Sequence, residues 1–186
     1  LTALLFAEVC QQADLPPGVV NIITGAGDTG RALVAHDDVD KVAFTGSTDV
    51  GRQIAKTVAG TRKKVTLELG GKAANIVFDD APVDQAVEGI VNGIFFNQGH
   101  VCCAGSRLLV QESVYEDVID KLKRRLTTLR VGDPLDKNTD VGAINSRQQL
   151  EKIQELVAIG EEEGASIYQP PCRLPEKGYW FVPTVF

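Results

Sequence analysis

Short apolar runs alternate with amphipathic stretches along the first third of the chain. Helical periodicity opens the chain over residues 1–13, and glycine-rich turns introduce two further predicted helices, at 31–36 and 46–59. The run 19–23 is typical of a strand buried on both faces, and a second buried strand at 41–45 and a third strand at 64–69 are also predicted. Strand, glycine-rich turn and helix therefore alternate, which predicts an α/β fold with a parallel, doubly wound sheet.

The second half of the chain continues in the same style. Its predicted strands are residues 75–78 and 108–111, with a last strand at 180–186, and its predicted helices are 83–96, 114–129 and 147–163. No low-complexity linker or repeat separates the two halves, so any domain boundary must be tight. Gly70-Gly71 is the expected place, which gives domains of residues 1–69 and 70–186.

Composition and charge exclude several classes of protein. The 186 residues carry a net charge of −6, and no apolar run approaches the ~20 residues of a membrane span. The densest basic run, Lys121–Arg125, has helical spacing and is typical of a solvated helix face rather than a nucleic-acid site. We therefore expect no membrane segment and no nucleic-acid partner.

The cysteines predict the redox state of the thiols, and the two ends of the chain indicate whether it is a fragment. Four cysteines are too few for a disulfide scaffold, so reduced thiols in an intracellular compartment, cytoplasmic or mitochondrial, are expected. The chain contains no Met, starts inside a helical pattern and stops on an apolar strand pattern, which indicates a fragment.

Glycine-rich turns between strands and helices are candidate anion sites, because the first amides of a helix lack internal partners. Gly46 and Ser47 lie at the start of one predicted helix, and the run Gly25–Gly30 matches the string G-x-G-x-x-G before another. The alternative is that these glycines only shape the loops.

Glu68 lies near the end of the predicted strand 64–69, where open α/β sheets bind ligands. If the strand is buried, desolvation raises the pKa of Glu68 toward the range of a general base. The alternative is a strand-end glutamate that points into water.

Cys102 and Cys103 are adjacent in a turn that contains Gly and Ser, between a predicted helix and a predicted strand. A thiolate in such a place is an effective nucleophile if its pKa is depressed or a base stands near. Inert burial is the alternative. A zinc site needs more ligands than His100, Cys102 and Cys103, so no metal is expected.

These features lie within motifs that resemble one family. The motifs are Leu-Pro-Pro-Gly-Val-Val-Asn-Ile at 15–22, Val-Ala-Phe-Thr-Gly-Ser-Thr at 42–48, Leu-Glu-Leu-Gly-Gly-Lys at 67–72, Phe-Asn-Gln-Gly-His-Val-Cys-Cys-Ala-Gly-Ser-Arg at 96–107 and Gly-Tyr-Trp-Phe-Val-Pro-Thr-Val-Phe at 178–186. In this order and spacing the chain resembles the aldehyde dehydrogenases over essentially its whole length, and residues 108–145 resemble the family-16 members most.

The resemblance implies a fold, a reaction and a site. It implies part of a Rossmann-type parallel-sheet cofactor domain over 1–69, followed by part of an α/β catalytic domain over 70–186. Cys102 would attack a small-molecule aldehyde, hydride would pass to NAD or NADP, and Glu68 would activate the water that hydrolyses the thioester. The Cys102 amide would supply an oxyanion-hole donor. The residues implied to line the cofactor site are Gly27, Gly30, Phe44, Gly46, Ser47, Val50, Leu69 and Gly70.

The resemblance also implies a homo-oligomer for the full-length protein. The chain differs from the family pattern in two respects. His100 stands where the family usually has Gln or Glu, and the upstream asparagine of the oxyanion hole lies before Leu1. We therefore expect this chain alone to lack dehydrogenase activity. Two other functions remain open: a catalytically silent scaffold or interaction domain of the same family, and an acylating dehydrogenase that passes the thioester to coenzyme A.

Overall fold

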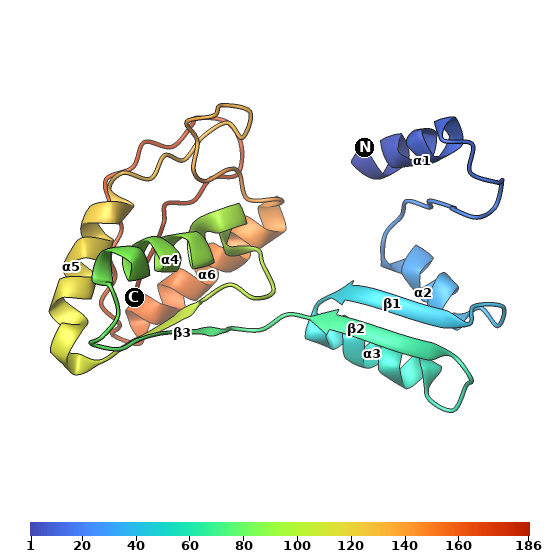
Figure 1. Cartoon of the computed structure of the whole chain (residues 1–186), viewed down its shortest axis with the longest axis horizontal. Helices are drawn as coiled ribbons and strands as arrows, with labels where there is room; N and C mark the ends of the chain where they lie inside the picture. Colours follow the sequence, from blue (N-terminus) through green and yellow to red (C-terminus); the bar gives the residue numbers. More distant parts are fainter. The chain divides into compact units, whose positions relative to one another are not determined.

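The computed structural model describes residues 1–186, and the chain divides into two compact units, Leu1–Leu69 and Gly70–Phe186 (Figure 1). Each unit has its own parallel sheet and its own core. The division falls between Leu69 and Gly70, at the glycine pair that the sequence marks. The assignment of the first unit to cofactor binding and of the second to catalysis stays a prediction.

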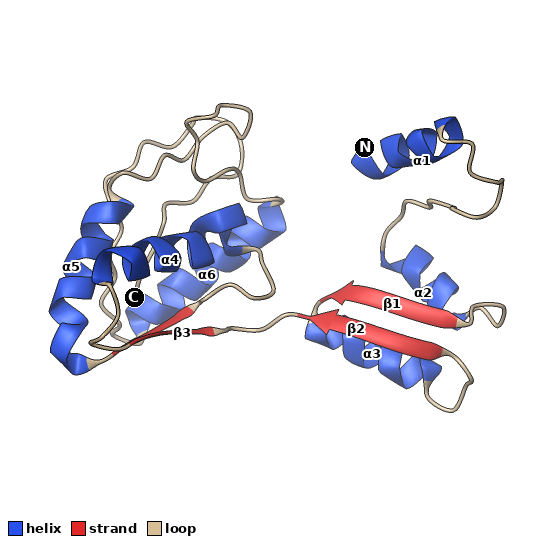
Figure 2. Ribbon diagram, in the orientation of Figure 1, coloured by secondary structure: helices blue, strands red, loops and turns tan.

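The first unit is built around a β-α-β crossover (Figure 2). Its elements are α1 (Thr2–Gln12), α2 (Gly27–Ala35), β1 (Lys41–Gly46), α3 (Thr48–Val58) and β2 (Lys64–Leu69). Strands β1 and β2 pair in parallel, with Phe44 opposite Leu67 and Thr45 opposite Glu68. The predicted strands 41–45 and 64–69 and the parallel sheet are confirmed.

A small core lies between α3 and one face of this sheet. Val42 of β1 packs with Ile54 and Val58 of α3, and Phe44 and Leu67 extend the same cluster. Because side chains alternate along a strand, Thr45 and Glu68 lie on the opposite face, which is exposed. The predicted burial of these strands is therefore met on one face only.

Two further predictions for the first unit need correction. Residues 19–23 do not form a strand, because no other segment of the chain pairs with them; Val19 N–H donates instead to Pro16 O, and Asn21 Nδ2 donates to Gly18 O. Helix α2 begins at Gly27 rather than at Arg31, so the glycine-rich run contributes its first turn.

The second unit has a two-stranded parallel sheet and three α-helices. Its elements are β3 (Ala74–Val77), α4 (Val83–Phe95), the 3₁₀ turn η1 (Phe96–Gly99), β4 (Arg107–Val110), the 3₁₀ turn η2 (Glu112–Val114), α5 (Tyr115–Leu126) and α6 (Arg147–Glu162). Strands β3 and β4 pair in parallel with Ile76 opposite Leu109. Each unit thus has its own two-stranded parallel sheet, and the predicted α/β fold class is confirmed.

Helices α4 and α5 enclose the core of the second unit. Val118 and Leu126 of α5 are fully buried and pack with Ile90 of α4 and Val77 of β3. On the solvent side of the same helix pair, Lys121 Nζ lies 2.9 Å from Asp84 Oδ1 and 3.3 Å from Asp117 Oδ2. The hydrogen bond to Asp84, together with Asp117, raises the pKa of Lys121.

The C-terminal segment contains one bridge instead of the predicted strand. Tyr168 and Val185 exchange backbone hydrogen bonds of 2.8 and 3.0 Å, and the neighbouring Pro183 has no N–H to extend the ladder. Trp180 caps a tight turn by donating from Nε1 to Lys177 O at 2.8 Å.

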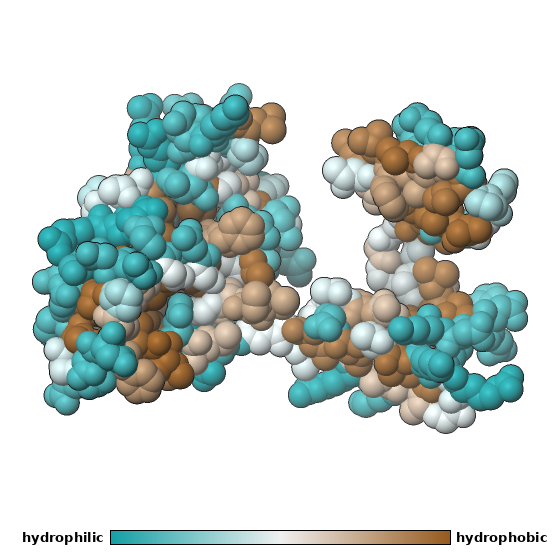
Figure 3. Space-filling view, viewed as in Figure 1, coloured by the Kyte–Doolittle hydropathy of each residue, from teal (hydrophilic) through white to brown (hydrophobic).

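The surface of the first unit is partly apolar. Along α1 the side chains of Leu4, Leu5, Phe6 and Val9 are exposed. Figure 3 shows brown, hydrophobic surface in the region of this helix. None of the helices is both long and apolar enough to span a membrane.

Candidate active site

The two adjacent cysteines occupy the centre of a β-turn, residues 101–104, named the thiol turn here. Ala104 N–H donates to Val101 O at 3.0 Å, which closes the turn and leaves Cys102 and Cys103 at its two middle positions. Ala104 is buried, whereas both cysteines are exposed and neither is in a disulfide. The thiol turn therefore presents two thiols to solvent from an anchored backbone.

The backbone before the thiol turn has an unusual conformation. Asn97, Gln98 and Gly99 have φ angles of 48°, 55° and 74°. The left-handed region costs a residue with a side chain about 1–2 kcal/mol, so this segment persists because its neighbours hold it. Asn97 supplies part of that hold, since His100 N–H donates to Asn97 O at 2.9 Å and Asn97 Nδ2 donates to His100 O at 3.2 Å.

Gln98 connects this segment to another loop of the second unit. With its amide oriented to satisfy its neighbours, the side-chain oxygen accepts from Gly142 N–H at 2.8 Å and the nitrogen donates to Asn97 O at 3.1 Å. Gly142 is buried, so Gln98 meets a donor that water cannot reach. This role is not visible in the sequence, because a glutamine as such predicts neither a positive φ nor a contact with a distant loop.

The segment after the thiol turn is tied back to α4 and β3. Gly105 N–H donates to Gly93 O at 3.0 Å, and Arg107 N–H donates to Ala73 O at 3.1 Å. The side chain of Asn75 lies so close to Gly105 that a Cβ there would lie 2.7 Å from Asn75 Nδ2. The thiol turn is therefore held on both sides.

The chemistry available at this turn is that of an exposed thiol beside a free amide. The backbone N–H of Cys102 donates to no other group of the protein, so it is available to an oxygen of a bound molecule. His100 lies two residues earlier, and its Nε2 is buried without a hydrogen-bond partner. No group of three or more His, Cys, Asp or Glu side chains is arranged to hold a metal ion.

Glu68, the predicted general base, belongs to the other unit. It is the fifth residue of β2, one before the strand ends, and it is exposed on the face away from α3. The predicted desolvation by a buried strand is therefore absent within this unit. Cys102 and Glu68 lie on different units, and each is placed by its own sheet.

A cavity of about 600 Å³ lies between α2, β1 and α3 in the first unit. Gly27, Gly30, Phe44 and Val50, which are half of the predicted cofactor residues, line it. The lining is largely apolar, and Gln53 adds one of its few polar side chains. A volume of this size falls within the range of small-molecule and cofactor sites, ~300–1,000 Å³.

The start of α3 adjoins this cavity and holds two more predicted residues. Ser47 is the N-cap of the helix, and its Oγ accepts from Val50 N–H at 3.3 Å. The ring of Phe44 lies over Gly46. The last two, Leu69 and Gly70, lie at the end of β2, where Leu69 packs on Gly51 of α3 and Gly70 is exposed.

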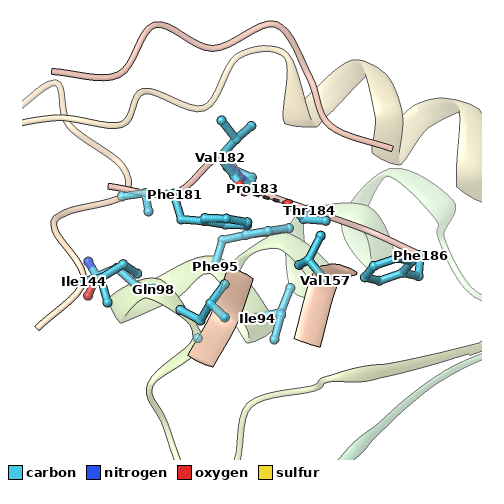
Figure 4. Close-up of a pocket in the computed structure, with 13 residues that line it drawn as sticks. Ile94, Phe95, Gln98, Ile144, Val157, Phe181, Val182, Pro183, Thr184 and Phe186 are labelled. Atoms are coloured by element: carbon cyan, nitrogen blue, oxygen red, sulfur yellow. Dashed lines mark hydrogen bonds between the residues drawn. The ribbon is translucent and has the colours of Figure 1, made fainter. Parts of the chain in front are cut away.

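A smaller cavity of about 250 Å³ lies in the second unit and carries no predicted site residue. Figure 4 shows Phe95 and Phe181 side by side in its wall, with Val157 and Phe186 nearby. Gln98 also lines it, so the segment before the thiol turn borders an apolar space.

Comparison with known proteins places these features in a family. The model of the aldehyde dehydrogenase family matches residues 1–186. An aldehyde dehydrogenase from Alternaria alternata is 48% identical to the chain over 188 aligned positions, which cover 100% of this chain and 38% of the relative. The chain therefore spans about 38% of the length of that curated relative.

Solved structures give the same result. An NAD-dependent aldehyde dehydrogenase from Sinorhizobium meliloti matches with a TM-score of 0.94 and 40% identity, over 98% of this chain and 37% of that protein. The NAD⁺ complex of an aldehyde dehydrogenase from Bacillus cereus matches with a TM-score of 0.93 and 41% identity, over 99% of this chain and 38% of that protein. The closer resemblance to family-16 members stays a prediction.

Proposed function

The chain belongs to the aldehyde dehydrogenase family, and on this premise we propose that it carries the nucleophile and the general base of an enzyme that oxidises aldehydes to carboxylic acids. The observation that carries the proposal is the thiol turn. Cys102 is exposed at the centre of a turn anchored on both sides, with its own N–H free. An acyl-transferring thiol needs this combination of access, rigidity and an adjacent donor.

In the proposed reaction Cys102 Sγ attacks the carbonyl carbon of the aldehyde to form a thiohemiacetal. The Cys102 N–H donates to the oxygen that becomes negative in this step, and removing one such donor typically costs ~10²–10³ in rate. When bound, NAD⁺ or NADP⁺ accepts the hydride that leaves the thiohemiacetal carbon. The product on the enzyme is then a thioester of Cys102.

Glu68 is proposed to remove a proton from the water that hydrolyses this thioester. A carboxylate near the end of a parallel strand is at the edge where such sheets bind ligands. Its side chain is exposed on the face away from α3, so a water molecule can reach it. A hydrolytic deacylation needs this base more than a transfer to coenzyme A does, which favours an acid as the product.

The cavity of the first unit is the proposed cofactor site. Its volume of about 600 Å³ suits the nucleoside part of NAD or NADP, and Gly27 and Gly30 keep one wall free of side chains. Gly46 and Ser47 place the first turn of α3 beside it, where unpaired amides and the helix dipole favour phosphate. The Bacillus cereus relative was solved with NAD⁺, which supports a nicotinamide cofactor for this family member.

The test is steady-state and single-turnover kinetics of the whole protein with a panel of aldehydes, comparing NAD with NADP. Cys102→Ser is expected to abolish acyl-enzyme formation. Glu68→Gln is expected to keep a first-turnover burst of NADH or NADPH and to slow the steady state by ~10²–10⁴, the usual contribution of a general base. Cys172→Ser, which replaces a thiol outside the thiol turn, serves as the matched control and is expected to keep the wild-type rate.

Each other outcome points to a different function. A Cys102→Ser variant with the wild-type rate contradicts the proposed mechanism. Wild-type protein that forms no acyl-enzyme with any aldehyde or activated ester favours the silent scaffold. A wild-type steady state that requires coenzyme A favours the acylating dehydrogenase.

A further inference from the structure

Lys63 joins the last turn of α2 to the rest of the first unit. It lies in the connection between α3 and β2, and its Nζ donates to Val34 O and to His36 O, at 2.8 Å in each case. Val34 belongs to α2, and His36 is the C-cap of that helix. We propose that Lys63 is a positioning residue of the cofactor cavity, because these two hydrogen bonds hold α2 in place as one of its walls. The proposal rests on the proposed function of this cavity as the site of NAD or NADP.

The two carbonyl oxygens need this donor, because the last carbonyls of a helix have no partner within it. The N–H that would continue the helix onto Val34 O is that of Asp38, and it donates instead to His36 Nδ1 at 3.3 Å. No backbone N–H donates to Val34 O, whereas His36 O also accepts from Val39 N–H at 3.1 Å. The positive charge of Lys63 is favourable at this end of the helix as well, because the helix dipole is negative there.

Few other contacts hold α2 in the unit. None of its side chains is buried, and Val34 is the one residue of the helix that packs against the core. The ion pair between Arg31 and Asp28 lies within the helix and ties it to nothing else. An element with few buried apolar contacts is a part of a structure that opens easily. Loss of the hydrogen bonds from Lys63 therefore affects α2 first.

The backbone of Lys63 is itself fixed to the other elements. Its N–H donates to Thr61 Oγ1 at 3.1 Å, and Thr61 Oγ1 donates to Val58 O at the end of α3 at 2.7 Å. The next residue, Lys64, begins β2 and donates from its N–H to Asp40 O at 2.9 Å. Lys63 therefore connects α2 to α3 and β2 from an anchored position.

Helix α2 supplies a wall of the cavity of about 600 Å³. The lining residues that it contributes are Gly27, Gly30, Arg31, Leu33, Val34 and Ala35. The other walls come from β1 and α3, which share the core of the unit, so a displacement of α2 changes the width of the cavity. If α2 is correctly placed in only about a tenth of the molecules, the Kd of a bound nucleotide rises about tenfold.

Lys63→Met in the whole protein tests this role, because it keeps much of the aliphatic chain and removes the ammonium. In the nucleotide-free protein, hydrogen exchange of the amides 31–36 is expected to be several-fold faster than in the wild type. Calorimetry with NAD and with NADP is expected to give a Kd about tenfold higher for the nucleotide that the wild type binds. The KM for that nucleotide is expected to rise in parallel while kcat is unchanged. A role in stability alone would leave Kd and KM as they are.

Three further variants complete the test. Lys63→Arg keeps a charged donor and is expected to restore the exchange rate and most of the affinity. Lys56→Met removes an exposed lysine of α3 and is expected to match the wild type in exchange, Kd and KM. If Lys63→Met does not fold, Lys63→Gln, which keeps an uncharged donor, takes its place and is expected to raise Kd in the same direction.

The wild-type titration separates this proposal from the proposed function. A wild type that binds neither NAD nor NADP contradicts the cofactor site, and the role of Lys63 falls with it. A wild type that binds a nucleotide, beside a Lys63→Met protein with the same Kd, overturns the role of Lys63 and leaves the cofactor site in place. Exchange at 31–36 that is unchanged in Lys63→Met also overturns the role of Lys63 alone.

Discussion

The side chain of Asn75 occupies the space that a side chain at position 105 would need. A Cβ on Gly105 would lie 2.7 Å from Asn75 Nδ2 and 3.1 Å from Asn75 Cγ. Asn75 belongs to β3, and Gly105 directly follows the thiol turn, so this contact fixes the turn against the sheet of the second unit. The position of Cys102 therefore depends on a residue far away in sequence.

Gly105→Ala is expected to displace the thiol turn. Forcing a methyl group against Asn75 costs ~1–3 kcal/mol of unfolding free energy, the usual range for overpacking. We also expect slower acylation of Cys102 by an activated ester, because a displacement of about 1 Å can cost ~10²-fold in rate. Urea unfolding and ester burst kinetics measure the two effects.

Gly89→Ala is the matched control for Gly105→Ala. Position 89 is an exposed site in α4, and nothing lies within 4 Å of a Cβ added there. This variant is expected to gain ~0.5–1 kcal/mol, because alanine has the higher helix propensity, and to acylate at the wild-type rate. Equal effects of the two substitutions would contradict the role of Asn75.

Ser47→Ala is expected to weaken both the fold and cofactor binding. It removes the oxygen that accepts from Val50 N–H at the start of α3, which costs ~0.5–2 kcal/mol. If the start of α3 binds a cofactor phosphate, the Kd for NAD or NADP, measured by calorimetry on the whole protein, rises as well.

Ser146→Ala provides the control for Ser47→Ala. Ser146 caps α6 of the second unit in the same way, accepting from Gln149 N–H at 3.2 Å. A similar loss of stability with an unchanged Kd is expected. A Kd that rises equally for both variants would show that the effect of Ser47 is on stability alone.

Gln98→Leu is expected to loosen the segment that precedes the thiol turn. The substitution leaves the buried N–H of Gly142 without its acceptor, which costs about 1–3 kcal/mol. Hydrogen exchange at Gly142 is expected to become faster. Gln148→Leu, at an exposed position of α6, is the control and is expected to change stability by less than about 0.5 kcal/mol.

Lys121 is expected to make stability fall at high pH. The pKa of Lys121 is raised above its usual 10.5 by the hydrogen bond to Asp84 and by Asp117. Folding therefore favours the protonated lysine, so its contribution is full below pH 10.5 and is lost as the pH rises through the raised pKa. The difference in unfolding free energy between wild type and Lys121→Met should shrink as the pH rises through this window. In an Asp84→Asn/Asp117→Asn background that shrinkage should disappear.

The sequence predicts those parts of the fold that depend on local pattern. The run 64–69 is a strand with those same bounds, and the helix predicted at 147–163 is observed as Arg147–Glu162. The run 19–23 has an equally good pattern but forms no strand, since a strand needs a neighbour and no segment of the chain supplies one. An apolar, β-branched pattern shows that a segment can form a strand, but the strand forms only where the fold places a second segment beside it.

In the candidate site, too, some residues can be identified from the sequence and others only from the fold. Cys102 and Glu68 stand out from their motifs, because a nucleophile and a base are chemical types that a sequence displays directly. Gln98 and Asn75 act through a left-handed backbone and a contact between distant segments, and neither property is visible in the residue type. The residues proposed to react are thus visible in the sequence, whereas the residues that hold them in place are not.

Trp180, whose indole donates to Lys177 O, is the only tryptophan of the chain, and the three tyrosines, Tyr115, Tyr168 and Tyr179, also lie in the unit Gly70–Phe186. Tryptophan and tyrosine fluorescence therefore reports on that unit alone, whereas both units contribute to the far-ultraviolet circular dichroism. Denaturation curves recorded by fluorescence and by far-ultraviolet circular dichroism will therefore distinguish the unfolding of the two units without any added label.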